Sequence, residues 1–159
     1  MSDVARKDAF RDYLFSAVED VGATLEPDDD WAPVMMLIGP EKALFVPLID
    51  GEGNDLTHDL PTLTALIAKE SPQLVGRVGM GWASTDLRDQ RPVSEREDRE
   101  EVLVVQIAEA GSRQEVWIGK VQRHPDAPPE VTSWEKSDST GGVMVEAIQA
   151  AMEHTHRSN

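Results

Sequence analysis

The apolar residues of this chain occur mainly in short runs separated by turn-forming residues, and this spacing limits the folds that it can adopt. The runs "PVMMLIG" and "ALFVPLI" are joined by "PEK", and "EVLVVQIAEA" and "EVWIGKVQR" are separated by a turn at "GSRQ". Short apolar runs joined by tight turns are typical of antiparallel hairpins. No run approaches the ~20 residues that a membrane-spanning helix needs. The sequence therefore predicts a sheet built from hairpins.

Three other stretches have the spacing of amphipathic helices. Apolar side chains recur every three or four positions in residues 4–22 and again in residues 143–152. A further helix is expected to begin near Asp59, whose side chain can cap it, with Pro61 in its first turn. Pro72 is expected to end this helix.

The order of these elements predicts the fold class. We expect an α+β fold with a mainly antiparallel sheet of five to six strands and three helices, in the order helix, two strands, helix, three to four strands, helix. Pro47 places the second strand at an edge of the sheet. The length fits a single domain over residues 1–159, with a charged loop at 84–100 and a frayed tail at 154–159. The layout looks like the profilin-like arrangement of roadblock and longin domains.

The charge of the chain restricts its partners. Thirty acidic and 15 basic residues give a formal net charge of −15. Such a field repels phosphate backbones, so we expect no direct contact with nucleic acid. It suits a basic protein partner, and an acidic inhibitor that imitates DNA is the sharper version of this interpretation. The chain has no cysteine, and "MSDVARKDAF" lacks the apolar centre of a secretory signal, so a cytoplasmic location is expected.

One acidic loop is a candidate metal site. The loop "DGEGND" and the residues after it bring Asp50, Glu52, Asp55 and His58 close together in the sequence. The pattern departs from a calcium loop, because Asp55 stands where that loop needs glycine and Pro61 replaces its closing glutamate. A polar turn is the simpler interpretation. A small metal-dependent hydrolase that uses these four residues is the competing one.

No other pattern in the sequence predicts catalysis. The chain contains no Gly-x-Ser-x-Gly, and Ser84 is more simply a residue of the turn that ends a strand. The lone Gly-x-Gly in "VGMGW" lies inside a predicted strand, where it does not bind phosphate. Gly79 and Gly81 instead favour the close approach of a helix or another backbone. We therefore predict no catalytic residue and no cofactor.

The four tryptophans are the strongest aromatic signal. Trp82, Trp117 and Trp134 fall on successive predicted strands, where packing across strands in the core is expected. Trp31 stands beside the acidic loop 26–30, a position that favours exposure. An aromatic patch on the outer face of the sheet, or a ligand pocket lined by tryptophans, is the alternative.

The segment "PVSEREDREEVLVV" at 92–105 begins as a mixed-charge run and becomes an apolar strand. Together with "GW" at 81–82, it resembles small uncharacterised proteins of actinobacteria and their phages. These proteins carry a tryptophan-containing strand, a Pro-Ser-Glu loop, and an Asp-Arg-Glu-Glu-Val-Leu segment that opens the next strand. The matching positions here are Trp82, Pro92, Ser94, Glu95, Asp98, Arg99, Glu100, Glu101, Val102 and Leu103, with Val93 inserted after the proline. The resemblance implies a bacterial or phage setting and no particular activity.

These observations together predict a non-enzymatic interaction or accessory protein, encoded by a phage or mobile element. Its partner is expected to be another protein or a second copy of itself, and not a membrane. A homodimer would form through an edge strand or the terminal helices. Contacts with the partner are predicted at Trp31, Trp134, Glu95 and Arg99.

Overall fold

The structure is a computed structural model and describes residues 3–49, 52–53, 55–56, 59–83, 95, 99–109 and 114–137. In chain order, the elements in this part of the chain are α1 (Asp3–Gly22), β1 (Val34–Ile38), β2 (Ala43–Pro47), α2 (Leu60–Glu70), β3 (Leu74–Ala83), β4 (Glu100–Glu109), β5 (Glu115–His124) and β6 (Ala127–Lys136). The predicted helix at 143–152 and the predicted tail at 154–159 lie outside the described residues. Of the predicted 84–100 loop, Glu95, Arg99 and Glu100 are described, and Glu100 is the first residue of β4.

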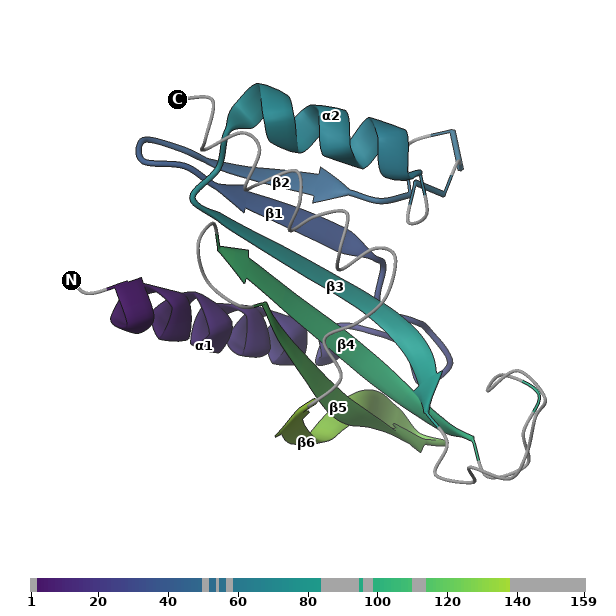
Figure 1. Cartoon of the computed structure of the whole chain (residues 1–159). Coiled ribbons are helices and arrows are strands. Elements are labelled where there is room, and N and C mark those ends of the chain that lie inside the picture. Colours follow the sequence, from purple (N-terminus) through teal and green to yellow (C-terminus); the bar gives the residue numbers. More distant parts are fainter. Residues whose placement is uncertain are drawn as a thin grey trace.

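The six strands form one sheet in the order β2-β1-β3-β4-β5-β6, and every neighbouring pair is antiparallel (Figure 1). This confirms the predicted α+β class and the antiparallel sheet. Strands β2 and β6 are its two edges. The edge position of β2 agrees with Pro47, because a proline has no N–H to donate to a second neighbour.

The stretch "HPDAPP" forms a tight turn between two strands, although its three prolines favour a loop. Strand β5 continues through His124, the turn contains only Pro125 and Asp126, and Pro128 and Pro129 already belong to β6. Because β6 has a neighbour on one side only, prolines interrupt its hydrogen bonding less than they would in a central strand.

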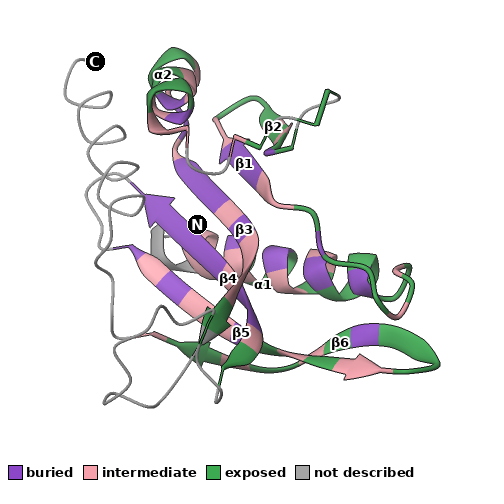
Figure 2. Cartoon of the chain, turned by 90° about the vertical axis from the view of Figure 1, so that its right-hand side faces the viewer, coloured by how far each residue is buried: buried purple, intermediate pink, exposed green. Residues whose placement is uncertain are grey.

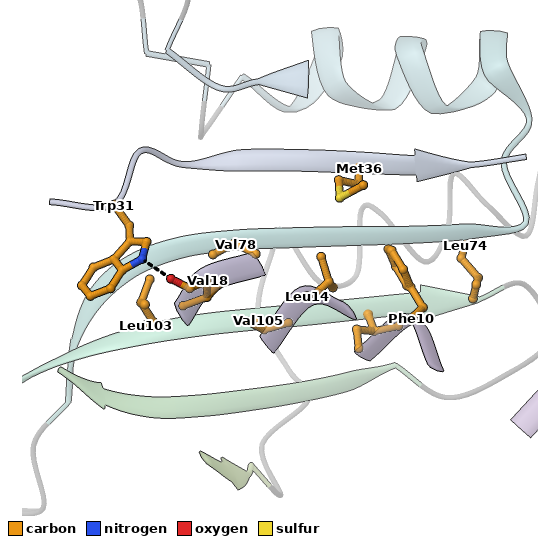
Figure 3. Packing of buried hydrophobic residues seen from close by; sticks show 10 residues of the cluster. Phe10, Leu14, Val18, Trp31, Met36, Leu74, Val78, Leu103 and Val105 are labelled. Atoms are coloured by element: carbon orange, nitrogen blue, oxygen red, sulfur yellow. Dashed lines mark hydrogen bonds between the residues drawn. The ribbon is translucent and has the colours of Figure 1, made fainter. Parts of the chain in front are cut away.

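Helix α1 covers one face of the sheet. Its buried residues Phe10, Leu14 and Val18 recur at four-residue spacing, which aligns them along one side of the helix. They pack on buried sheet residues that share this face: Met36, Leu74, Val78, Leu103, Val105 and Ile107 (Figure 3). A Cβ at Gly76 would lie 2.7 Å from Phe10 Cζ, so the missing side chain allows α1 to approach the sheet. The predicted close approach at Gly79 is not seen, because no described atom lies within 4 Å of a Cβ there.

Helix α2 packs on the opposite face of the sheet. Leu63 and Ile67 contact a second core cluster that contains the sheet residues Met35, Leu37, Val75 and Ala108. The helix begins as predicted, since the carboxylate of Asp59 accepts a hydrogen bond from the backbone N–H of Thr62 at 3.2 Å. It ends at Ser71, which has a left-handed backbone conformation and donates its N–H to the carbonyl of Ile67.

Burial is greatest in the centre of the sheet. Figure 2 shows buried residues concentrated in β3 and β4, and exposed residues along β2 and much of β6. Strand β4 is buried on both faces, as its apolar sequence predicts. In the described part of the chain, neither helix is long and apolar enough to cross a membrane.

Candidate functional site

An open groove lies between α1 and the hairpin β1–β2. Helix α1 packs mainly against β4 and β6, so it lies off the β2 edge of the sheet. The register pairs Val34 with Pro47 and Met36 with Phe45, and these pairs form the floor of the groove. Its volume is about 190 Å³. The lining residues are Tyr13, Leu14, Ala17, Val18, Val21, Trp31, Ala32, Pro33, Val34, Met36, Phe45, Pro47 and Val78.

The groove is apolar although the chain is acidic. None of its 13 lining residues is charged, whereas 28% of the whole chain is. Three of its side chains are large apolar groups that remain exposed, namely Tyr13 at 55%, Val21 at 48% and Phe45 at 60%. Contiguous exposed apolar surface of this kind marks sites where proteins bind partners or ligands. The arrangement can therefore bury apolar groups of a partner or ligand.

Trp31 forms one end of the groove, and the prediction that it is exposed is wrong. The indole is 4% exposed, and its Nε1–H donates to the carbonyl of Val18 at 2.9 Å (Figure 3). That carbonyl lies in the last two turns of α1, so the hydrogen bond ties the indole to the helix. A Cβ at Gly22 would lie 2.5 Å from indole Cζ2, so the glycine makes room for the ring. The groove wall is thus held in place before any partner binds.

Acidic residues border the apolar lining. Asp20 precedes Val21 on α1 and Asp30 precedes Trp31, and both carboxylates are exposed. Arg123 of β5 holds Asp30 in position through a contact of 2.5 Å between Nη2 and Oδ1. The same guanidinium binds both carboxylate oxygens of Glu101, at 2.8 and 3.0 Å. Hydrogen bonding to Glu101 raises the pKa of Arg123 far above its usual value, against the effect of burial.

A second hollow of about 470 Å³ lies where residues 30–33 separate from β3. At its wall, Arg77 donates from Nη1 to the side-chain oxygen of Gln106 at 2.8 Å, and its buried Nε has no hydrogen-bond partner among the residues that the structure describes. Burial lowers the pKa of Arg77, and the charge of Asp55 acts against this effect. Because Asp30 and Asp55 share the hollow with Arg77, its charge does not favour one class of ligand.

The predicted metal site is only half described. Glu52 and Asp55 are exposed, whereas Asp50 and His58 lie outside the described residues. Among the residues that the structure describes, no three acidic or histidine side chains are grouped so that they could hold a metal ion. Ser84 also lies outside the described residues. The four-residue metal site therefore stays a prediction.

The four residues predicted to contact a partner differ in their surroundings. Trp31 and Trp134 belong to the core beneath α1, where Trp134 stacks on Phe15 with ring centroids 4.2 Å apart. Arg99 instead lies over the ring of Trp82, 5.1 Å from its centroid, near the end of the β3–β4 hairpin. Glu95 is exposed.

Sequence reasoning missed Tyr13 and Phe45. Phe45 lies in the run "ALFVP", where its neighbours Leu44 and Val46 are half-buried on the other face of β2. The sequence signal for Phe45 is an edge strand that is apolar on both faces. Only the face with Leu44 and Val46 packs against a core cluster, so the other face is left exposed. Tyr13 carries no comparable signal, since a single tyrosine on a helix is common on protein surfaces.

Comparison with known proteins adds no family to these observations, because no protein-family model, curated protein or solved structure matches this chain. What the fold defines is an antiparallel sheet with a helix on each face. What the site defines is an apolar groove beside one sheet edge. Any function must follow from these two features.

Proposed function

We propose that this protein is a non-enzymatic interaction or accessory protein, and that the groove between α1 and β1–β2 binds an apolar segment of a partner protein. The observation that carries the proposal is the uncharged lining, with Tyr13, Val21 and Phe45 exposed together. Covering apolar surface contributes roughly 25 cal/mol per Å². Burial of these three side chains by a partner would therefore stabilise the complex.

The charge around the groove defines the partner further. Asp20 and Asp30 border the apolar lining, and the chain as a whole carries −15. Lysine or arginine beside the apolar segment would meet these carboxylates, and the field would speed the encounter. We therefore propose a protein segment with an apolar centre and basic flanks. A nucleic acid fits neither the charge nor the apolar lining.

Selection from a random peptide library displayed on phage tests this function. The library is selected on the wild-type protein, and the selected peptides are then tested against Phe45→Glu. Trp82→Glu is the matched control, because Trp82 is also a large exposed side chain, at 46%, and lies outside the groove. We expect peptides with an apolar centre and basic flanks that bind the control and not Phe45→Glu. Peptides that bind all three proteins equally, or no enrichment, would refute the proposal.

The sequence supports two alternative functions. The net charge favours an acidic inhibitor that imitates DNA. In that case duplex DNA would compete with this protein for binding to a DNA-binding partner. A small metal-dependent hydrolase would use Asp50, Glu52, Asp55 and His58. A thermal unfolding transition unchanged by millimolar calcium or zinc would remove this second alternative. The cytoplasmic location, the phage or mobile-element origin, the homodimer and the profilin-like arrangement remain predictions.

A further inference from the structure

The outer edge of β2 has a defined hydrogen-bonding pattern. Gly39 donates its N–H to the carbonyl of Lys42 at 2.9 Å, and Leu48 donates to the carbonyl of Pro33 at 3.0 Å. Backbone groups of an antiparallel strand alternate between its two sides. In this register, the groups of residues 44 and 46 point toward β1, and those of residues 43 and 45 point away from it. No described strand pairs with that outer side of β2.

Ala43 and Phe45 leave this edge able to pair with another strand, whereas Pro47 opposes pairing at its end. Residues 43–47 carry no charge, and Pro47, which has no N–H, lies at an outward-facing position at the end of the edge. Charged residues that discourage edge pairing in other proteins occur here only in the preceding turn, at Glu41 and Lys42. Lys42 binds Glu70 at 2.8 Å, which draws its ammonium group toward α2.

The groove and the open edge meet at Phe45. Its side chain lies on the floor of the groove, while its backbone N–H and carbonyl point outward from the sheet. A strand added beside β2 would therefore place alternate side chains on the groove side and hydrogen-bond Ala43 and Phe45 with its backbone. A helix in the groove would leave these two backbone positions unpaired.

We infer that the partner segment binds as an extended strand that adds to β2. This inference rests on the proposed function and specifies the form of the ligand. The segment is about five residues long, to match β2, with apolar side chains at alternate positions and lysine or arginine at its ends. Its backbone supplies sequence-independent hydrogen bonds, and the groove selects the alternate apolar side chains.

Amide hydrogen exchange followed by NMR tests the inference, with the synthetic peptide Lys-Val-Thr-Val-Thr-Val-Lys as the probe. The amides of Leu44 and Val46 already point toward β1 and serve as internal controls. We expect saturating peptide to slow exchange at Ala43 and Phe45 by at least about tenfold, with little change at the two controls. N-methylation of the valines should abolish binding if the added strand is antiparallel, and N-methylation of the threonines if it is parallel.

Other outcomes separate this inference from the proposed function. If the side-chain signals of Val21 and Val34 shift while exchange at Ala43 and Phe45 is unchanged, the groove binds its ligand and strand addition is wrong. Tolerance of N-methylation at both sets of positions also overturns strand addition. If the peptide causes no shift at millimolar concentration, strand addition is overturned for this class of segment, and the library selection decides the function by itself.

Discussion

The hydrogen bond between Arg77 and Gln106 shows that the stability lost on a substitution depends on which polar group is left without its partner. Within the described part of the chain, Nη1 of Arg77 donates to Gln106, and its buried Nε has no hydrogen-bond partner. Gln106 is itself buried, so each side chain depends on the other. Removing one partner of a buried hydrogen bond costs more than removing both, because the remaining polar group has lost contact with water.

We therefore expect Gln106→Leu to lower the free energy of unfolding by about 1–3 kcal/mol. Adding Arg77→Met to this variant should recover most of the loss, since the guanidinium that lost its hydrogen bond to Gln106 is then absent. Urea unfolding of the two single variants, the double variant and the wild type measures the coupling. A double variant no more stable than Gln106→Leu would contradict this account of Arg77.

Trp31 shows why a residue's neighbours along the chain can mislead. Its position beside Asp28, Asp29 and Asp30 favoured exposure, yet the indole is buried against α1. The space for the ring comes from Gly22, nine positions earlier, and its hydrogen-bond acceptor is Val18. Neither relationship follows from local composition, because both depend on how α1 and the following loop fold against the sheet.

At the scale of elements, close packing of β5 and β6 depends on a glycine that the sequence did not single out. A Cβ at Gly119 would overlap the side chain of Val131 and lie 2.9 Å from ring atoms of Trp134. Trp134 also stacks on Phe15 of α1, so the ring is constrained on a second side. The glycine therefore permits the contact among α1, β5 and β6.

We expect Gly119→Ala to lower the free energy of unfolding by about 1–3 kcal/mol, because the ring and the valine must move. Gly79→Ala is the matched control on β3, where no described atom lies within 4 Å of the added Cβ. The control should be neutral or slightly stabilising. Equal effects of the two substitutions on thermal unfolding would show that packing at Gly119 is not the cause.

The end of α2 is joined to the β1–β2 turn by Lys42 and Glu70. The hydrogen bond from Lys42 lowers the pKa of Glu70 below its usual value. A carboxyl group whose pKa is lowered in the folded state stabilises that state above its unfolded pKa, and the contribution is lost as pH falls through the folded value.

Lys42→Met should therefore reduce the loss of stability that occurs as pH falls below the ordinary glutamate pKa of 4.5, because the lowered pKa of Glu70 in the folded state depends first on Lys42. At neutral pH the variant should be less stable than the wild type, and the difference should shrink as the solution becomes acidic. Unfolding by urea at several pH values measures this trend. A difference between the two proteins that stays constant with pH would contradict the role of Glu70.

Across the whole molecule, the parts predicted correctly are those that local patterns determine. Short apolar runs between turn-forming residues predicted the hairpin strands, and Asp59 with Pro61 predicted the start of α2. The groove was not predicted, because it joins Tyr13 and Val21 of α1 to Phe45 of β2. That meeting depends on the order of strands in the sheet, which places β2 at the edge and α1 over its other side.

The central claim is that the groove, and not exposed apolar surface in general, binds a partner segment. Isothermal titration calorimetry tests this claim directly, with one peptide from the library selection titrated into the wild type, Phe45→Glu and Trp82→Glu. The account predicts at least about a tenfold loss of affinity for Phe45→Glu, equivalent to about 1.4 kcal/mol, and no loss for Trp82→Glu. Equal affinities for all three proteins, or equal losses for both variants, would contradict it.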